Sequence, residues 1–384
     1  MAHVNTIQRY ANLCLVWFTK GVAAHKPPAP TASQKIISFN DASPTIKPLL
    51  DTVRDKIILP QYLPKDQRKK MYSPKFKALL DRDPFVLEID GEVHKFPHQD
   101  MRMLPNTNKS IIAVINAMKT RADFQLLPRL LEGVCVQAGR NVDRAVFCKA
   151  IRSASYADAI PVIIDCIKRV KSTGLRLDIH ETSAQLFTAI QEHALKHGWT
   201  KEATETALGW SQQALDIIET EELHKPMQPR NSAPVRMGFP TFRDPLFLAA
   251  RLHLAAALAV KHHKGRDTDR AVKRYAEQLV KLWPKSKGLL NMYDEDAMGR
   301  KEGGAYLLKS QNYLCHAAPI YSGLMLAQVV LGDTPLSKAL AERADILNKE
   351  ITMAVSHEEQ RGTKTTSRGL DRYKAYVEAK PWEA

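Results

Sequence analysis

An amphipathic helix that ends at a glycine and passes at once to a new helix start is the feature that most constrains the fold. In the stretch YADAIPVIIDCIKRVKSTGLRLD, residues 156–178, the isoleucines share one helical stripe with Val170, and charged side chains occupy the other. Gly174 can adopt the left-handed conformation that ends many helices, and Asp178 can accept backbone N–H bonds at a helix start. Such a handover between similar helices predicts a repeat of helical hairpins.

The same signals for helix starts and helix ends recur along most of the chain. Candidate helix pairs are 107–119 with 125–138, 143–152 with 158–173, 179–197 with 200–221, 245–263 with 267–282, and 305–331 with 334–356. The glycines at expected helix ends are Gly139, Gly174, Gly198, Gly265 and Gly332. The candidate N-caps are Asp143, Asp178, Thr200, Asp244 and Thr334. The pattern predicts an all-α, right-handed superhelical array of irregular hairpins, in which stacking buries a continuous core.

The N-terminus has the composition of a mitochondrial targeting segment. Residues 1–40 contain no Asp or Glu, carry Arg9 and several lysines, and can form a short amphipathic helix before a Pro-rich linker. Acid-poor, basic and amphipathic segments are typical of transit peptides. We therefore expect import into the mitochondrial matrix, and leave open whether the segment is cleaved.

The rest of the chain divides by composition. Asp90-Gly91 suits a type I′ turn between two β-prone arms, which predicts one small β-hairpin at residues 85–96. The expected division is an extended basic arm at 41–106, the first part of the array at 107–221, a Pro-rich linker at 222–244, the second part of the array at 245–358, and a basic tail at 359–384. The arm and the tail are therefore expected to carry charged surfaces outside the array.

A surplus of positive charge favours a polyanionic partner. The chain has 56 Lys and Arg against 41 Asp and Glu, which gives a net charge of +15 and a pI near 9.5. A nucleic acid or an anionic surface relieves the self-repulsion of such a surplus. A generally basic protein without such a partner would have the same totals, so the alternative stays open.

The predicted RNA contact is the stretch KDQRKKMYSPKFK at residues 65–77. An extended basic chain with interleaved aromatic rings can follow a phosphate backbone and stack on exposed bases. The candidate RNA-binding residues are Lys65, Arg68, Lys69, Lys70, Tyr72, Lys75, Phe76 and Lys77. The alternative is a run of charge that is only solvated. The tail from residue 361 to 380 is a second candidate.

No sequence pattern points to catalysis, a cofactor or a metal. The five cysteines are scattered without a C-x-x-C pair, which indicates reduced thiols rather than a zinc site. His193 and His197 could share a metal on one helix, but no third ligand is evident, so solvated histidines are the preferred interpretation. The acidic cluster at 294–296 is interpreted as a charged loop. We expect a protein that is not an enzyme and takes no small-molecule substrate.

No membrane span is expected. Residues 245–260 stand out as the longest apolar candidate, and they are interrupted by Arg251 and His253. They therefore fall short of the roughly 18 uncharged apolar residues of a spanning helix.

One unit resembles a pentatricopeptide repeat. Residues 142–178 have two helices, a small-residue hinge and a Gly-Leu-x-x-Asp close, and the step from Asp143 to Asp178 is 35 residues, the period of that family. Proteins of the family read single-stranded RNA one base per repeat through polar side chains. The resemblance places Val146 at the first base-reading position and Asp178 near the second. Because valine cannot hydrogen-bond a base edge, the resemblance implies a scaffold with an RNA partner rather than base-by-base reading.

The whole layout is similar to that of accessory proteins of fungal mitochondrial ribosomes. The acid-poor MAHVNTIQRY, the basic KDQRKKMYSPKFK and the helical array carry this resemblance. It implies a non-catalytic structural constituent of the mitochondrial ribosome, with the large subunit favoured, that docks on ribosomal RNA and on other mitochondrial ribosomal proteins. The alternative is a free pentatricopeptide-like factor that binds mitochondrial mRNA in translation or maturation.

Overall fold

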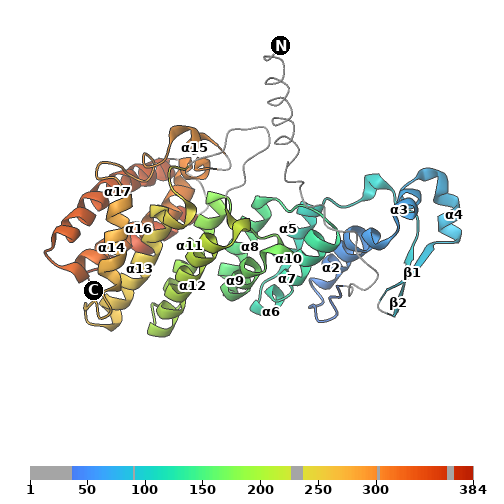
Figure 1. Cartoon of the computed structure of the whole chain (residues 1–384), viewed down its shortest axis with the longest axis horizontal. Helices are drawn as coiled ribbons and strands as arrows, with labels where there is room; N and C mark the ends of the chain where they lie inside the picture. The colour runs from blue at the N-terminus through green and yellow to red at the C-terminus, as the bar shows by residue number, and fades with distance from the viewer. Residues whose placement is uncertain (1–36, 90, 226–236, 301–302, 361–366, 384) are drawn as a thin grey trace, which may run out of the picture.

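The computed structural model is an elongated row of helices (Figure 1). It describes residues 37–89, 91–225, 237–300, 303–360 and 367–383. The helices follow one another in chain order, from α2 near one end to α17 at the other, and the two strands lie beyond α2 (Figure 1). Most of the predicted targeting segment and part of the Pro-rich linker lie outside the described residues.

The described residues are all-α apart from one β-hairpin, as the sequence predicts. The earlier helices are α2 (Lys47–Val53), α3 (Lys65–Met71), α4 (Lys77–Arg82), α5 (Thr107–Ala117), α6 (Arg121–Phe124), α7 (Leu127–Glu132), α8 (Arg144–Tyr156), α9 (Ile160–Lys168), α10 (Val170–Thr173), α11 (His180–Lys196) and α12 (Lys201–Thr220). The later helices are α13 (Pro245–His262), α14 (Ala271–Leu282), α15 (Glu295–Gly299), α16 (Ser310–Leu331), α17 (Pro335–Gln360) and α18 (Arg368–Tyr373). The strands β1 (Phe85–Ile89) and β2 (Glu92–Phe96) pair antiparallel, with Phe85 opposite Phe96. The predicted all-α class with one small β-hairpin is confirmed.

Neighbouring helices pack in chain order. α8 contacts α5 and α11, α11 contacts α12 and α13, and α13 contacts α14 and α16. α16 in turn contacts α17 and α18. Each hairpin therefore covers an apolar face of the preceding one, which is how a stacked array buries a core that no single hairpin could form.

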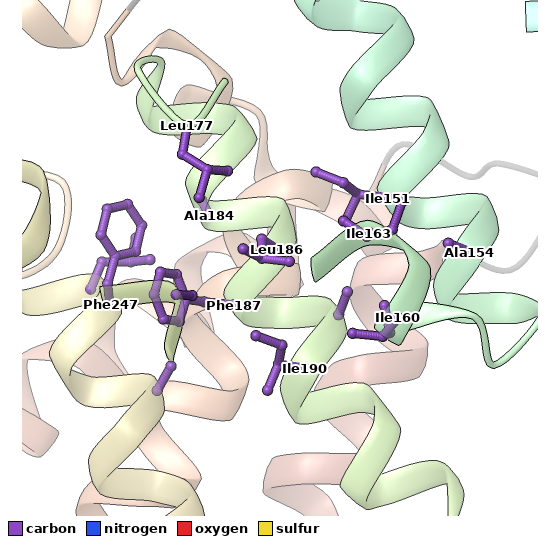
Figure 2. Packing of buried hydrophobic residues seen from close by; sticks show 14 of the residues in the cluster. Ile151, Ala154, Ile160, Ile163, Leu177, Ala184, Leu186, Phe187, Ile190 and Phe247 are labelled. Atoms are coloured by element: carbon purple, nitrogen blue, oxygen red, sulfur yellow. The ribbon is translucent and has the colours of Figure 1, made fainter. Parts of the chain in front are cut away.

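Aliphatic side chains of successive helices form the core between hairpins. Figure 2 shows Ile151 of α8 near Ile163 of α9, with Leu186 and Ile190 of α11 on the neighbouring helix. All four are fully buried. They belong to one cluster that includes residues of every long helix, so the array has a single continuous core.

The core also crosses the Pro-rich segment. The rings of Phe187 in α11 and Phe247 in α13 stack with centroids 5.0 Å apart, and Figure 2 shows them facing each other. Helices on the two sides of residues 222–244 are therefore in direct contact. The division of the chain into parts at that segment stays a prediction.

Most of the glycines and N-cap residues predicted at helix ends lie at helix ends in the structure. The five glycines predicted at helix ends all have positive φ, between 58° and 72°. Asp244 and Thr334 accept backbone N–H bonds at helix starts, whereas Asp143 and Thr200 stand at N-cap positions without such a bond. The prediction of Asp178 as an N-cap was wrong, because α11 begins two residues later, at His180, and the Asp178 side chain is half-buried.

The longest apolar helix is α16, which corrects the choice of residues 245–260. Among the described helices, only α16 is long and apolar enough by composition to cross a membrane, with a mean hydropathy of 1.5. However, 67% of the most apolar 18-residue stretch of α16 is buried within the protein. The helix packs against α13, α17 and α18, which makes it a core helix of the array.

Buried histidines bond to polar side chains along α11. His316 of α16 lies 2.7 Å from the hydroxyl of Thr188, and His253 of α13 lies 2.9 Å from the amide of Gln191. Burial lowers the pKa of His253 to about 3 and holds the pKa of His316 well below its ordinary value. Both imidazoles are therefore neutral in the folded protein near neutral pH.

Replacing Ile164 with Asp tests the buried stripe of α9. Ile164 is 3% exposed, so the variant places an unpaired charge in the core and should lose several kcal/mol of unfolding free energy. The matched control is Lys168→Asp on the exposed face of the same helix, which should lose less than about 1 kcal/mol. Thermal melting measures both, and an unchanged Tm for Ile164→Asp would show that the stripe does not face a core.

Acidification should destabilise the array through its buried histidines. Folding lowers the pKa of His253, so the stability that its neutral form contributes is present above the unfolded pKa of about 6.5 and is lost as the pH falls toward the folded value. The loss is about 1.4 kcal/mol per pH unit for each such histidine. His253→Gln should make the decline in unfolding free energy between about pH 6 and pH 4 shallower by up to that slope. Denaturant titrations across this range would contradict the argument if the two slopes were equal.

Candidate nucleic-acid interface

The basic stretch at residues 65–77 is folded, which corrects the prediction of an extended arm. α3 is followed by a 3-10 turn (Pro74–Phe76) and by α4. Together with the β-hairpin they enclose a small separate core of Leu59, Leu63, Met71, Leu80 and Phe96. Two prolines lie at the starts of helical turns, where a missing N–H costs no intrahelical bond. We name this unit, residues 59–96, the N-terminal lobe.

Five of the six predicted cations are exposed on the N-terminal lobe. They are Lys65, Lys69, Lys70, Lys75 and Lys77. Arg68 is half-buried and donates from Nη1 to Oε1 of Gln61 at 2.7 Å, so it fastens α3 to the preceding turn. Asp66 is the only acid between residues 65 and 77. The N-terminal lobe therefore presents a local surplus of positive charge on a folded support.

The two predicted stacking residues support the core of the N-terminal lobe. Tyr72 and Phe76 are half-buried and pack against it. Burial raises the pKa of the Tyr72 hydroxyl, although the nearby charges of Arg140 and Arg68 act in the opposite direction. Part of each ring packs against this core, so base stacking by these two residues stays a prediction. The exposed lysines are more accessible to RNA than the two rings.

The described part of the basic tail folds against the array. Its helix α18 packs on α16. Arg372 is buried there, pairs with Glu192 of α11 and donates to the carbonyl of Cys315 at 3.2 Å. This arginine therefore stabilises the end of the chain, while residues 361–366 lie outside the described residues.

The base-reading positions implied by the pentatricopeptide resemblance are not open to RNA. Val146 is 1% exposed in α8. Asp178 is half-buried, and burial raises the pKa of its carboxyl although the charge of Arg176 opposes the shift. The unit, which contains α8, α9 and the short α10, therefore lacks an accessible pair of base-reading side chains.

The structure supplies a third group beside His193 and His197 that the sequence did not reveal. Asp158, in the turn between α8 and α9, lies 2.8 Å from Nδ1 of His193 and 3.1 Å from Nε2 of His197. The three groups bring possible ligand atoms within 4.8 Å of one another. The missing signal is tertiary, since the turn between α8 and α9 meets the end of α11 only in the folded protein.

Asp158, His193 and His197 form a hydrogen-bonded cluster among themselves. Burial disfavours the charge on Asp158, but hydrogen bonds from His197 and His193 outweigh it and hold the pKa of the carboxyl below its ordinary value. His193 has a side chain that is only 12% exposed, so the interpretation as a solvated histidine is wrong for it. Imidazole and carboxylate are also zinc ligands. Each carboxylate oxygen of Asp158 nevertheless contacts one of the two imidazoles. These two contacts hold the α8–α9 turn against α11.

Comparison with known families decides what kind of protein carries this lobe and array. A family model for mitochondrial ribosomal protein mS27 matches residues 25–375. The chain belongs to the mS27 family of mitochondrial ribosomal proteins. It is also 36% identical over 339 residues to the small ribosomal subunit protein mS27 of Neurospora crassa, an alignment that covers 84% of this chain and 85% of the relative.

Membership of the mS27 family confirms the main functional predictions. The resemblance to fungal mitochondrial ribosome proteins, the structural rather than enzymatic role and the location in the mitochondrial matrix all agree with it. The large subunit favoured from the sequence is not supported, because the mS27 relative is by name a small-subunit protein. Charge and helical layout suit either subunit, so the sequence held no signal that could separate them.

Proposed function

We propose that this chain is a non-catalytic structural constituent of the small subunit of the mitochondrial ribosome, docked on ribosomal RNA and on neighbouring ribosomal proteins. The observation that carries the subunit assignment is the 36% identity to a small-subunit mS27 over 84% of the chain. The elongated array supports the structural part of the proposal, because stacked hairpins expose long surfaces to several partners at once.

The exposed lysines of the N-terminal lobe are the proposed contact with ribosomal RNA. Their ammonium groups are accessible to phosphates, and neutralising a phosphate releases condensed counterions. The folded support strengthens this assignment. A lobe that is already ordered loses less conformational entropy on binding than the extended arm expected from the sequence would lose.

The outer face of the same lobe suits contact with a neighbouring protein. Strand alternation places Val86 and Val93 on the hairpin face turned away from the core of the N-terminal lobe, and they are 57% and 61% exposed. Leu79 of the same lobe is 58% exposed, and Met101 and Met103, which follow the lobe in the sequence, are 66% and 77% exposed. A contact with a neighbouring protein would remove these exposed apolar side chains from water.

The free mRNA-binding factor is the less favoured function. It would need accessible polar side chains at the base-reading positions, and Val146 is buried. The family to which the chain belongs is ribosomal. Neither observation favours recognition of a particular transcript.

Sedimentation tests the subunit assignment. In a sucrose gradient of mitochondrial lysate at moderate salt, the protein should co-sediment with the small ribosomal subunit in a one-to-one ratio, because a structural constituent stays bound. A soluble matrix enzyme serves as the control that remains at the top. A peak with the large subunit would contradict the assignment, and a peak among free proteins would favour the mRNA factor.

A salt titration tests the lysines of the N-terminal lobe. The test variant changes Lys65, Lys69, Lys70, Lys75 and Lys77 to Gln. Each lost phosphate contact should reduce the slope of log affinity against log salt by about 0.7–0.9 units, so five engaged lysines should reduce it by about 3.5–4.5 units. Binding of the full chain to small-subunit ribosomal RNA measures this slope, and the melting temperature should stay unchanged because the side chains are exposed.

The charge-matched control distinguishes a local site from general attraction. It changes five exposed lysines of the later helices and their connections to Gln, namely Lys261, Lys273, Lys281, Lys287 and Lys349. This set should affect the slope much less. Equal losses for the two sets would show that the N-terminal lobe is merely a solvated part of a basic surface.

A further inference from the structure

A second cluster of cations surrounds a cavity in the array, well separated in sequence from the N-terminal lobe. The cavity has a volume of ≈ 390 Å³ and lies where the end of α5, the second half of α8 and the first residue of α18 meet. The cations that line it are Lys119, Lys149, Arg152 and Arg368, and Tyr156 lines it as well. No Asp or Glu of the described residues is among its lining side chains. We name it the four-cation pocket.

The two arginines of the pocket lack anionic partners among the described residues. The Nε of Arg368 is buried and has no hydrogen-bond partner. In the part of the chain that the structure describes, neither Arg152 nor Arg368 forms an ion pair with a carboxylate. Glu181 acts on Arg152 from a distance, but its carboxylate is engaged by Arg144 at 3.8 Å. A buried donor or charge without a partner is costly.

The direction of the pKa shifts at the pocket agrees with the gathering of cations that line it. Burial lowers the pKa of Arg152, and the charge of Arg368 lowers it further. The same arginines act on His316, where burial is the main cause of a lowered pKa and the charges of Arg372, Arg368 and Arg152 add to it. Like charges brought together from α8 and α18 repel each other, and an anion in the cavity would relieve that repulsion.

The chemistry of the lining favours a phosphate group. Arginine binds phosphate through parallel N–H bonds, and lysine adds a compact positive charge. The volume lies within the range of about 300–1,000 Å³ typical of ligand pockets, so the cavity can hold more than a single water-sized anion. Tyr156 is 65% exposed and offers a ring face to a base attached to that phosphate.

We propose that the four-cation pocket binds a phosphodiester group of single-stranded ribosomal RNA, with an adjacent base stacked on Tyr156. This inference rests on the proposed ribosomal function and adds to it a second RNA contact, on the array itself. Three segments distant in sequence build the site, so it exists only in the folded protein. The tail contributes through Arg368 at its folded end, rather than as an extended basic strand.

The test uses full-length protein in which the five lobe lysines are already Gln, so that remaining RNA binding reports the pocket. The probe is a single-stranded RNA of ten uridines, followed by fluorescence anisotropy over a range of salt concentrations. Arg152→Gln with Arg368→Gln should weaken binding at low salt at least tenfold and reduce the salt slope by about 0.7–1.4 units. Tyr156→Ala should weaken binding about 5- to 160-fold and leave the salt slope unchanged.

Two controls separate RNA binding from a structural role. Lys168→Gln with Lys261→Gln removes the same charge from exposed positions elsewhere and should change neither affinity nor slope. Arg152→Lys with Arg368→Lys keeps the charge and should retain the slope. The glutamine pair should not lower the melting temperature of RNA-free protein, because it removes a repulsion. A lower melting temperature with unchanged RNA binding would overturn the proposal in favour of a structural role.

Other occupants give different results. A peptide of ten glutamates that binds the wild-type pocket and not the glutamine pair, while the uridine probe ignores the change, would overturn the RNA assignment in favour of an acidic protein segment. Inorganic phosphate that stabilises only the wild-type pocket, again without an RNA effect, would overturn it in favour of a free phosphate. In both cases, wild-type protein that still sediments with the small subunit would leave the proposed function standing.

Discussion

A buried carboxylate, Asp244, joins α11 to α13 across the Pro-rich segment. Its side chain is 1% exposed, and its Oδ1 accepts from the backbone N–H of Leu246 at 2.9 Å and from the hydroxyl of Tyr293 at 2.8 Å. Its Oδ2 lies 3.0 Å from Nε2 of His180, whose other ring nitrogen lies 2.8 Å from the hydroxyl of Tyr306. A buried charge is tolerated only when such bonds satisfy it. Because His180 begins α11 and Asp244 begins α13, this network and the adjacent aromatic core keep the array continuous across the Pro-rich segment.

Local signals in the sequence predicted the elements, and tertiary contacts decided how they are used. Glycine at a left-handed helix end and Asp244 at a helix start act within a few residues, so both could be predicted. The folded N-terminal lobe could not be predicted in this way. Its core joins Met71 of α3 with Leu59 from the preceding turn and Phe96 from the hairpin, so it depends on contacts between separate elements. Proline spacing favoured an extended chain, but the prolines lie at the starts of helical turns, where they are compatible with folding.

The candidate RNA-binding residues show the same division between composition and geometry. The surplus of lysine in α3 and α4 was visible in the sequence, and its exposure follows from the charge itself. The four-cation pocket was not visible, because Lys119, Arg152 and Arg368 come from three segments that only the array brings together. Asp158 likewise meets His193 only when the α8–α9 turn packs on α11. Spacing rules detect sites within one helix, and the sites of a stacked array lie between helices.

The placement of cations separates structural charges from candidate contacts. No lysine is buried among the described residues, whereas Arg251, Arg343 and Arg372 are. Each of these three arginines donates to amide, carbonyl or carboxylate oxygens of neighbouring helices, so its charge is used inside the protein. Arg152 and Arg368 differ from them, because they face a shared cavity without comparable acceptors. The three buried arginines have acceptors inside the protein for part of each guanidinium group, although the Nε atoms of Arg251 and Arg372 also lack a partner. Arg152 and Arg368 are half-buried and have no such acceptor among the described residues, so the proposed RNA phosphate would supply one.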